Sequence, residues 1–252
     1  MQLLPKSGDS ETDIEEIVPV ADPMRHKCRE EEIVCGRTFV ACFKCDRVVS
    51  SQGNKLRGFL GRLYPKEVLL HHHEKNKQVR YSYPLVQCKV VDGDPMVVGI
   101  DDGMQIVRDL FTGLEKLELG DTTYLIVYRR ALFNGNGVKL LNEARNYFFL
   151  TPWLALNERN YQKYQRTGSI LKRKKLLEDI LVANIISMSK GLGYTVPGLI
   201  EAKIQKYEEV HTSLKGNPML GFLGKFVVNF EIPDYLGIGK SVSRGFGTVK
   251  KI

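Results

Sequence analysis

The sequence predicts an α+β protein of two tandem ferredoxin-like (βαββαβ, RRM-like) domains with a cleft between them. Strand and helix patterns follow one another in the order βαββαβ over residues 38–132. A Gly/Asn-rich stretch at 133–139 indicates a linker, and the chain beyond it repeats the order more loosely. We therefore place the two domains at 24–135 and 140–252. An acidic lead-in at 1–23 is expected to be poorly ordered or extended.

Hydrophobic spacing outlines the first half of the chain. Residues 38–45, TFVACFKC, alternate as a strand does and carry β-branched and aromatic side chains. Residues 55–65 place four apolar side chains at helical spacing, and Pro65 closes that helix. Asp92-Gly93-Asp94-Pro95 indicates a hairpin-type turn between two strands. The remaining elements are expected as strands at 81–93 and 94–103, a helix at 104–117 and a strand at 122–132.

The second half resembles a less regular copy of the first. It opens with an expected strand at 146–156. A long helix follows over 170–194, with one apolar face and an end at Gly191. Residues 202–216 alternate in part and predict a strand. Residues 221–252 predict a strand, a glycine-rich loop and a final strand.

The charge of the chain favours a polyanionic partner. The formal net charge is +8, and removing the acidic lead-in leaves 36 basic and 23 acidic residues in 24–252, a formal +13. No apolar run approaches the ~20 residues of a membrane span, and the N-terminus has no signal-peptide pattern. Five cysteines in a chain of this length fit a reducing cytoplasm better than a disulfide framework.

The C-terminal stretch GIGKSVSRGFGTV is the most specific motif. Glycines permit backbone turns and a close approach to phosphate, and the cations and hydroxyls between them supply hydrogen-bond donors. It is not a Walker A loop, because that motif needs a glycine at position 234, which is Asp, and a following helix. A glycine-rich hairpin turn is the structural alternative. The candidate RNA-backbone ligands are Gly237, Gly239, Lys240, Ser241, Ser243, Arg244, Gly245 and Gly247.

At this point the sequence resembles a known family. YLGIGKSVSRGFGTVKKI is similar to the glycine-rich loop and last strand of the RAMP superfamily. Combined with KLRGFLGRLYP, LLHHH and YSYPLVQCKV, it resembles the CRISPR repeat-RNA-processing endoribonucleases of the Cas6 family. The resemblance covers both ends of the chain and, by the order of elements, most of 33–252. Residues 133–220 match only in the order of their elements. It implies two ferredoxin-like domains and metal-independent cleavage of CRISPR repeat RNA, giving 5′-hydroxyl and 2′,3′-cyclic or 3′ phosphate ends.

The same resemblance places the catalytic histidine after the first helix, where His71, His72 and His73 stand. Cutting RNA through its own 2′-hydroxyl needs a base and an acid, and histidine can be either near neutral pH. If the segment is extended, His71 and His73 share a face, and we favour that pair with His73 first. Tyr81 is the preferred assistant. The other candidates for assistance are Tyr83, Lys55 and Lys66.

Three further motifs are weighed against structural alternatives. The run 159–175 interleaves basic and aromatic residues, which suits phosphate contact and base stacking, although a solvated helix start has the same composition. Its candidate RNA ligands are Lys172, Arg173, Lys174 and Lys175. In CFKC, Cys42 and Cys45 face opposite sides of a strand, which disfavours zinc. Trp153 is expected in the core, and His26 and His211 as structural or surface residues.

The sequence therefore predicts an endoribonuclease that needs no metal and no cofactor. Its partner is CRISPR repeat RNA, and a CRISPR effector complex and a homodimer are compatible with it. The main alternative is a non-catalytic RAMP subunit that binds guide RNA with the same loop. A third is an enzyme of another class that uses the three histidines as a metal site.

Overall fold

The computed structural model describes residues 34–50, 53–71 and 83–252, and of His71 it describes only the backbone. The lead-in at 1–23 lies outside the described residues. The first half contains β1 (Thr38–Cys45), α1 (Gly53–Leu63), α2 (Val68–His71), β2 (Val86–Val91), β3 (Asp94–Ile100), α3 (Gly103–Gly113), β4 (Lys116–Leu119) and β5 (Thr122–Asn134). The second half contains β6 (Lys139–Phe149), α4 (Glu158–Arg166), α5 (Ile170–Gly191), β7 (Ala202–Leu214), β8 (Asn217–Glu231), the 3-10 turn η1 (Val242–Arg244) and β9 (Val249–Lys251).

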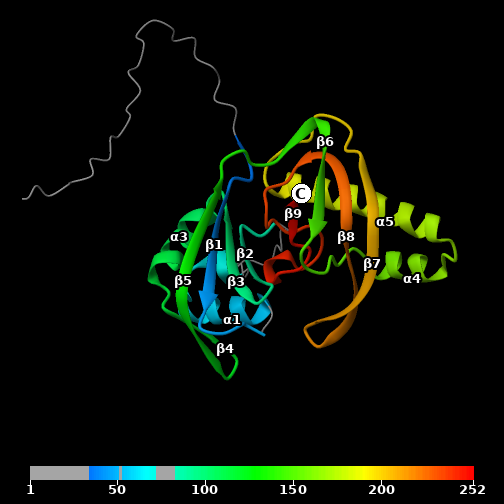
Figure 1. The fold of residues 1–252 in the computed structure, drawn as a ribbon. Coiled ribbons are helices and arrows are strands. Elements are labelled where there is room, and N and C mark those ends of the chain that lie inside the picture. Colours follow the sequence, from blue (N-terminus) through cyan, green and yellow to red (C-terminus); the bar gives the residue numbers. More distant parts are fainter. Residues whose placement is uncertain (1–33, 51–52, 72–82) are drawn as a thin grey trace, which may run out of the picture. The chain divides into compact units, whose positions relative to one another are not determined.

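The two halves share one strand topology (Figure 1). The first sheet has the order β2-β3-β1-β5-β4 and the second the order β7-β8-β6-β9, and the strand pairs are antiparallel. Without the added edge strand β4, both orders are that of a βαββαβ unit, so the predicted α+β fold with two ferredoxin-like sheets is confirmed. In the second unit the short turn η1 lies between β8 and β9, where the first unit has α3.

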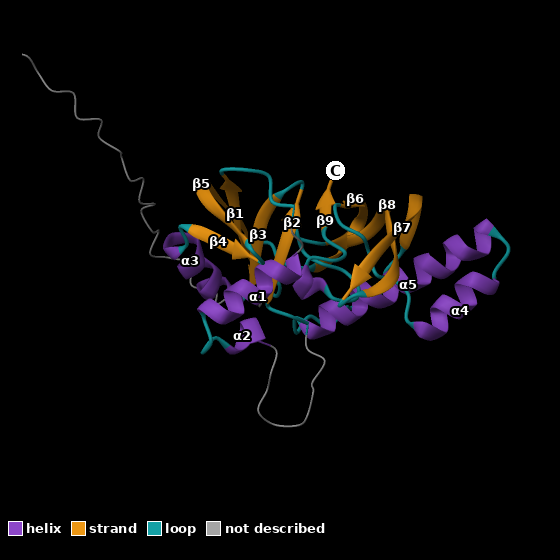
Figure 2. Ribbon diagram, turned by 90° about the horizontal axis from the view of Figure 1, so that it is seen from below, coloured by secondary structure: helices purple, strands orange, loops and turns teal. Residues whose placement is uncertain are grey.

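The helices lie along one side of the two sheets (Figure 2). One apolar core fills the space between the first sheet and its helices α1 and α3. A second core packs α5 against the second sheet and also takes in residues of β1 and β3 from the first half. Cys42 belongs to this second core and Cys45 to the first, so the two cysteines face opposite sides of β1, as predicted. Trp153 is buried, also as predicted.

Among the element boundaries that differ from prediction, two are the ends of α3 and β6. The helix expected over 104–117 ends at Gly113, and residues 116–119 instead form strand β4, which alternates exposed and buried side chains. Gly120, with φ of 70°, turns that strand back into β5. The strand expected over 146–156 ends at Phe149, because the chain turns at Pro152, which has no N–H for a ladder bond.

The Asp92-Gly93 turn forms as predicted and fixes the register of β2 against β3. Asp92 has φ of 51° and Gly93 has φ of 81°, the two left-handed positions of a tight hairpin turn. Asp94 pairs with Val91 across the hairpin. Within the described residues, no helix is long and apolar enough to cross a membrane.

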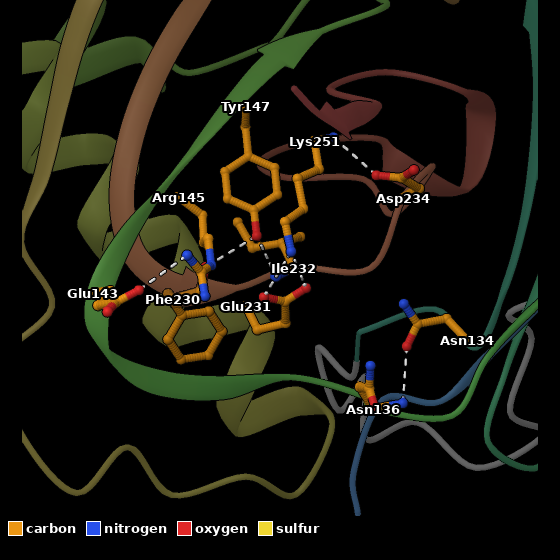
Figure 3. A network of polar contacts seen from close by, with 10 residues as sticks. All are labelled: Asn134, Asn136, Glu143, Arg145, Tyr147, Phe230, Glu231, Ile232, Asp234 and Lys251. Carbon is orange, nitrogen blue, oxygen red and sulfur yellow. Dashed lines mark hydrogen bonds and ion pairs between the residues drawn. The ribbon is translucent and has the colours of Figure 1, made fainter.

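Along the junction of the two halves, where we expected a cleft, there is a pocket of about 330 Å³. The wall contributed by the second half carries Glu231, Asp234 and Lys251 (Figure 3). Lys251 binds both carboxylates, Glu231 through Nζ at 3.1 Å and Asp234 through its backbone N–H at 2.8 Å. Two carboxylates against one ammonium repel phosphate, so this pocket is a poor route for RNA.

Candidate active site

The end of α2 and the glycine-rich loop are joined by one side chain, Arg57 of α1. Its Nε and Nη2 donate to the carbonyl oxygen of Leu70 at 3.3 and 3.2 Å. Its Nη1 donates to Ser243 Oγ in η1 at 3.0 Å. The carbonyl of Leu70 belongs to the last turn of α2, where such groups lack helical partners, and a guanidinium is a suitable cap. Arg57 therefore holds the residue before His71 close to the glycine-rich loop.

The other side of the loop is fixed to β2 and the segment before it. Gly237 N–H donates to Gln87 Oε1 at 3.1 Å, and its carbonyl accepts from the Tyr83 hydroxyl at 2.5 Å. Tyr83 is one of our candidate assistants, but its hydroxyl is engaged here, and burial raises its pKa far above the ordinary value. These contacts make Tyr83 a support of the loop.

The glycines of the loop are required by packing within the protein. A Cβ at Gly247, where φ is +63°, would lie 1.9 Å from the carbonyl oxygen of Ile238. On the facing helix, a Cβ at Gly53 would lie 2.7 Å from the carbonyl oxygen of Arg244. The loop therefore passes so close to its own backbone and to α1 that side chains do not fit. Gly237, Gly245 and Gly247 are buried, so the phosphate approach that we predicted is left to other members of the loop.

The exposed part of the loop is short and cationic. Lys240 is exposed, Arg244 is partly exposed, and Ser241 stands between them in the left-handed region with φ of 58°. Lys240 Nζ donates to the carbonyl oxygen of Leu156 at 3.1 Å, which ties this end of the loop to the segment between β6 and α4. Ser243 is buried and is occupied by Arg57. Of the predicted loop ligands, Lys240 and Arg244 thus remain the best placed to meet a phosphate.

A pocket of about 140 Å³ opens beside Arg244. Its walls come from α1, β2, the turn after β6, β7 and the loop, through Gly53, Val90, Thr151, Pro152, Thr212, Arg244, Gly245 and Phe246. Unlike the pocket at the junction, it contains a cation and no carboxylate. An anionic ligand is therefore favoured here.

Known proteins with the same architecture are similar to this chain over most of its length. The family profile described as the Cas6b N-terminal domain matches residues 37–134, and that of the Cas6b C-terminal domain matches 139–252. A crystal structure of Cas6b is 33% identical with a TM-score of 0.79, covering 86% of this chain and 100% of the other. The chain belongs to the Cas6b family. A second structure, a CRISPR RNA processing endoribonuclease Cas6b, is 31% identical with a TM-score of 0.67 and the same coverage.

A solved structure of much lower identity to this Cas6b chain adds only to the fold. A type IV Cas6 crRNA endonuclease is 10% identical with a TM-score of 0.53, and it covers 86% of this chain and 100% of its own. An uncharacterised protein of Methanocaldococcus jannaschii is 43% identical over 146 residues, which are 57% of this chain and 97% of that protein.

Most of the predicted catalytic residues of this Cas6b protein lie outside the described residues. His72, His73 and Tyr81 belong to that part of the chain, and the side chain of His71 does too. The backbone of His71 ends α2, so the chain is helical at this residue. The extended conformation that we assumed for 71–73 is therefore wrong at His71, and the choice of His73 and His71 as the catalytic pair remains a prediction. Lys55 and Lys66, the other candidate assistants, are exposed.

The basic run of this Cas6b protein is divided between structural and exposed cations. Arg173 joins α5 to α4, because its Nε donates to the carbonyl oxygen of Thr167 at 2.7 Å and its guanidinium lies over the Tyr164 ring at 4.8 Å. Lys175 pairs with Asp179 at 2.9 Å. Lys172 and Lys174 have no ion-pair partner among the described residues. These two lysines are the better candidates for RNA contact.

Sequence reasoning missed Arg57, Gln87 and Lys89. Arg57 is one of three cations in the pattern of α1, and nothing in the sequence distinguishes it from the exposed Lys55 and Arg62. Gln87 and Lys89 alternate with Val86 and Cys88 along β2, which favours a solvent-facing side in a sequence. In this Cas6b fold both are buried, because the glycine-rich loop covers that side of the strand.

Lys89 is the most unusual of the three. Its side chain is buried, and its Nζ donates to Gln87 Oε1 at 2.9 Å. Burial lowers the pKa of this amine to about 7, since no carboxylate offsets the lost hydration and only the Cys88 thiol opposes the effect. Gln87 Oε1 also accepts from Gly237 N–H, so this amine touches the group that holds the loop.

We expect Lys89→Met to stabilise the protein most at low pH. The pKa of Lys89 is lower in the folded chain, so the unfolded chain binds more protons between about pH 7 and the ordinary value of 10.5. The free energy of unfolding of the native protein, which the burial of Lys89 lowers, therefore rises with pH over this window. The difference in unfolding free energy between variant and native protein, measured in urea, should shrink above about pH 7 by up to about 1.4 kcal/mol per pH unit. The exposed Lys55→Met variant is the control, and a flat difference for Lys89→Met would contradict the argument.

Proposed function

We propose that this Cas6b protein is an endoribonuclease that cuts CRISPR precursor RNA within its repeat. The proposal is supported by the similarity over both halves to a CRISPR RNA processing endoribonuclease. The observation that carries it is the Arg57 bridge, which holds the start of the histidine run against a cationic loop. A proton-transfer group and an anion-binding group side by side are what RNA cleavage needs.

The mechanism that we propose uses the 2′-hydroxyl of the RNA as nucleophile. A histidine, His73 or His71, removes its proton while a second group, histidine or Tyr81, protonates the departing 5′ oxygen. The oxygen attacks the adjacent phosphorus, the P–O5′ bond breaks, and the products carry a 2′,3′-cyclic phosphate and a 5′-hydroxyl. Cations of the loop, Lys240 and Arg244, offset the charge that grows on the phosphate. This route needs no metal.

The two halves of the chain have different roles in this proposal. Residues 24–135 would carry the catalytic segment, and 140–252 would carry the loop that binds RNA backbone. Lys172 and Lys174 would extend the RNA contact along α5. The protein would act in the cytoplasm, alone or as a homodimer, and would pass its product to a CRISPR effector complex.

The test uses end-labelled repeat RNA in the presence of EDTA. We expect the all-ribose RNA to be cut and an RNA with one 2′-deoxy nucleotide at the mapped cut to be protected, because the nucleophile is then missing. Cleavage of both RNAs would contradict 2′-hydroxyl attack, and loss of cleavage in EDTA would favour the metal-site interpretation of the histidines. Tight binding without cleavage would favour a non-catalytic subunit.

A further inference from the structure

The open face of the second sheet carries a cross-strand row of basic and aromatic residues. Lys206 of β7 pairs in register with Lys225 of β8. Lys225 pairs with Phe148 of β6, and Phe148 pairs with Lys250 of β9. The row therefore runs Lys-Lys-Phe-Lys across the whole sheet, over three strand spacings of ~4.8 Å each, about 14 Å in all.

Helices α4 and α5 lie along one side of the second sheet (Figures 1 and 2), and the alternation of β6 places the row on the other side. Phe148 stands between Tyr147 and Phe149, which are both buried in the core beneath α5. Phe148 itself is partly exposed and belongs to neither apolar core. Lys206 and Lys225 are exposed, and the Nζ of Lys250 lies 5.8 Å from the centre of the Tyr235 ring. Within the described part of the chain, α4 and α5 cover only the other face of this sheet.

The charges of the row are not balanced within the described residues. Two like charges directly opposite each other on neighbouring strands destabilise a sheet. Glu208 lies two positions along β7 on the same face as Lys206, opposite Leu223, yet within the described residues neither Lys206 nor Lys225 forms an ion pair with it or with another acid. Other lysines of this sheet do have acidic partners, as Lys203 does with Glu178 at 3.6 Å. A repulsive pair that the fold does not neutralise is a place where an external anion gains binding energy.

We infer that this row, which we call the lysine row (Lys206, Lys225, Phe148 and Lys250), binds the backbone and a base of single-stranded RNA. Ammonium groups neutralise phosphates, and a partly exposed phenylalanine between them can stack on a base. A four-stranded sheet that stacks two or three bases is a known way to bind RNA, and an RNA duplex keeps its bases out of reach. The inference rests on the proposed function for its ligand. It adds a second RNA contact on the face opposite the helices.

The binding test uses a labelled single-stranded RNA of about 12 nucleotides and the matching duplex, with anisotropy read from about 0.05 to 0.3 M salt. For Lys206→Gln with Lys225→Gln, we expect affinity for the single strand to fall about tenfold and the log–log salt slope to fall by about 1.4. For Phe148→Leu, we expect affinity to fall about 5- to 100-fold with an unchanged slope. Lys190→Gln, an exposed lysine of α5, is the matched control. Unchanged binding in the lysine and phenylalanine variants overturns the inference.

A charge reversal separates binding from folding. Lys206→Glu places opposite charges at the facing pair, so we expect Tm to rise by about 1 to 3 °C while RNA affinity falls further than with glutamine. A residue that served only the fold would not move stability and binding in opposite directions. If Lys206→Glu leaves affinity unchanged, the lysine row is not an RNA contact.

The cleavage assay keeps the two proposals distinct. At saturating protein, variants of the lysine row should cut repeat RNA at the native single-turnover rate, because saturation compensates for their weaker binding. If native protein binds the RNA probe but cuts no repeat RNA, the proposed function fails. The salt dependence of binding then still shows whether the lysine row contacts RNA. If native protein binds no RNA, both fail. If polyglutamate competes better than RNA does, the row is a docking site for an acidic protein and the inference is overturned.

Discussion

Replacing the catalytic histidine by alanine is expected to slow single-turnover cleavage of repeat RNA by about 10² to 10⁴ fold. Alanine cannot take the proton of the 2′-hydroxyl or give one to the leaving oxygen, while the contacts that bind RNA elsewhere remain. We expect the largest loss for His73→Ala, a smaller one for His71→Ala and the smallest for His72→Ala. The measurement is the cleavage rate at saturating protein, with the dissociation constant of the RNA determined for each variant.

The control for this series is His211→Ala. His211 is exposed on β7, so its removal changes the histidine content without touching the site. The catalytic variant should also lose one limb of the pH–rate profile, because the group that titrates near neutral pH is gone. If all three variants of the run cut at the native rate, the catalytic acid and base lie elsewhere in the chain. A loss of RNA affinity that matches the loss of rate would instead assign the histidines to binding.

The fold could be predicted well because each element carries its own pattern. Alternation marks β1, and helical spacing marks α1 and α5. The Asp92-Gly93 pair, which accepts positive φ, marks a hairpin. The errors occurred where a short local pattern was ambiguous. Residues 116–119 continue the apolar spacing of α3, but their pairing with β5, a contact with a later part of the chain, decides that they form a strand.

The candidate site was harder to predict, because its supports are contacts between distant residues. Arg57 and Ser243 are 186 positions apart, and Gln87 and Gly237 are 150 apart. The glycine-rich loop was visible in the sequence. The sequence does not tell whether the group that packs against each glycine is a phosphate or another part of the protein. The groups that come close to these glycines are largely backbone atoms of the protein itself. The motif therefore explains how the loop packs more directly than how RNA binds.

These distant contacts give the site a definite arrangement. The loop belongs to the second half of the chain, and α1 and α2 belong to the first. Arg57 and Gln87 fasten the loop at two points, and Arg57 also holds the end of α2, so the loop and the residue before His71 are held together. The reacting groups of an RNA-cleaving site must be positioned closely, and small displacements lower the rate strongly. The bridge should therefore matter for the rate more than for RNA binding.

Arg57→Ala is expected to lower the single-turnover cleavage rate by about 10- to 100-fold with only a small change in RNA affinity. The variant frees the Leu70 carbonyl and the Ser243 hydroxyl, and the end of α2 is no longer held against the loop. Arg57→Lys keeps the charge but cannot reach both partners with a planar fork, so we expect it to restore little of the rate. Ser243→Ala removes only the link to the loop and should give an intermediate loss.

Arg62→Ala is the matched control for this prediction, because Arg62 ends the same helix and is exposed. Arg57 is partly buried, so its loss also lowers stability, and Tm is measured for every variant so that rates are compared well below unfolding. A positioning role requires that the rate at saturating protein falls while the dissociation constant holds. If Arg57→Ala weakens RNA binding and leaves the saturated rate unchanged, Arg57 is an RNA ligand or a support of one. In that case the bridge between α2 and the loop does not set the geometry of the reaction.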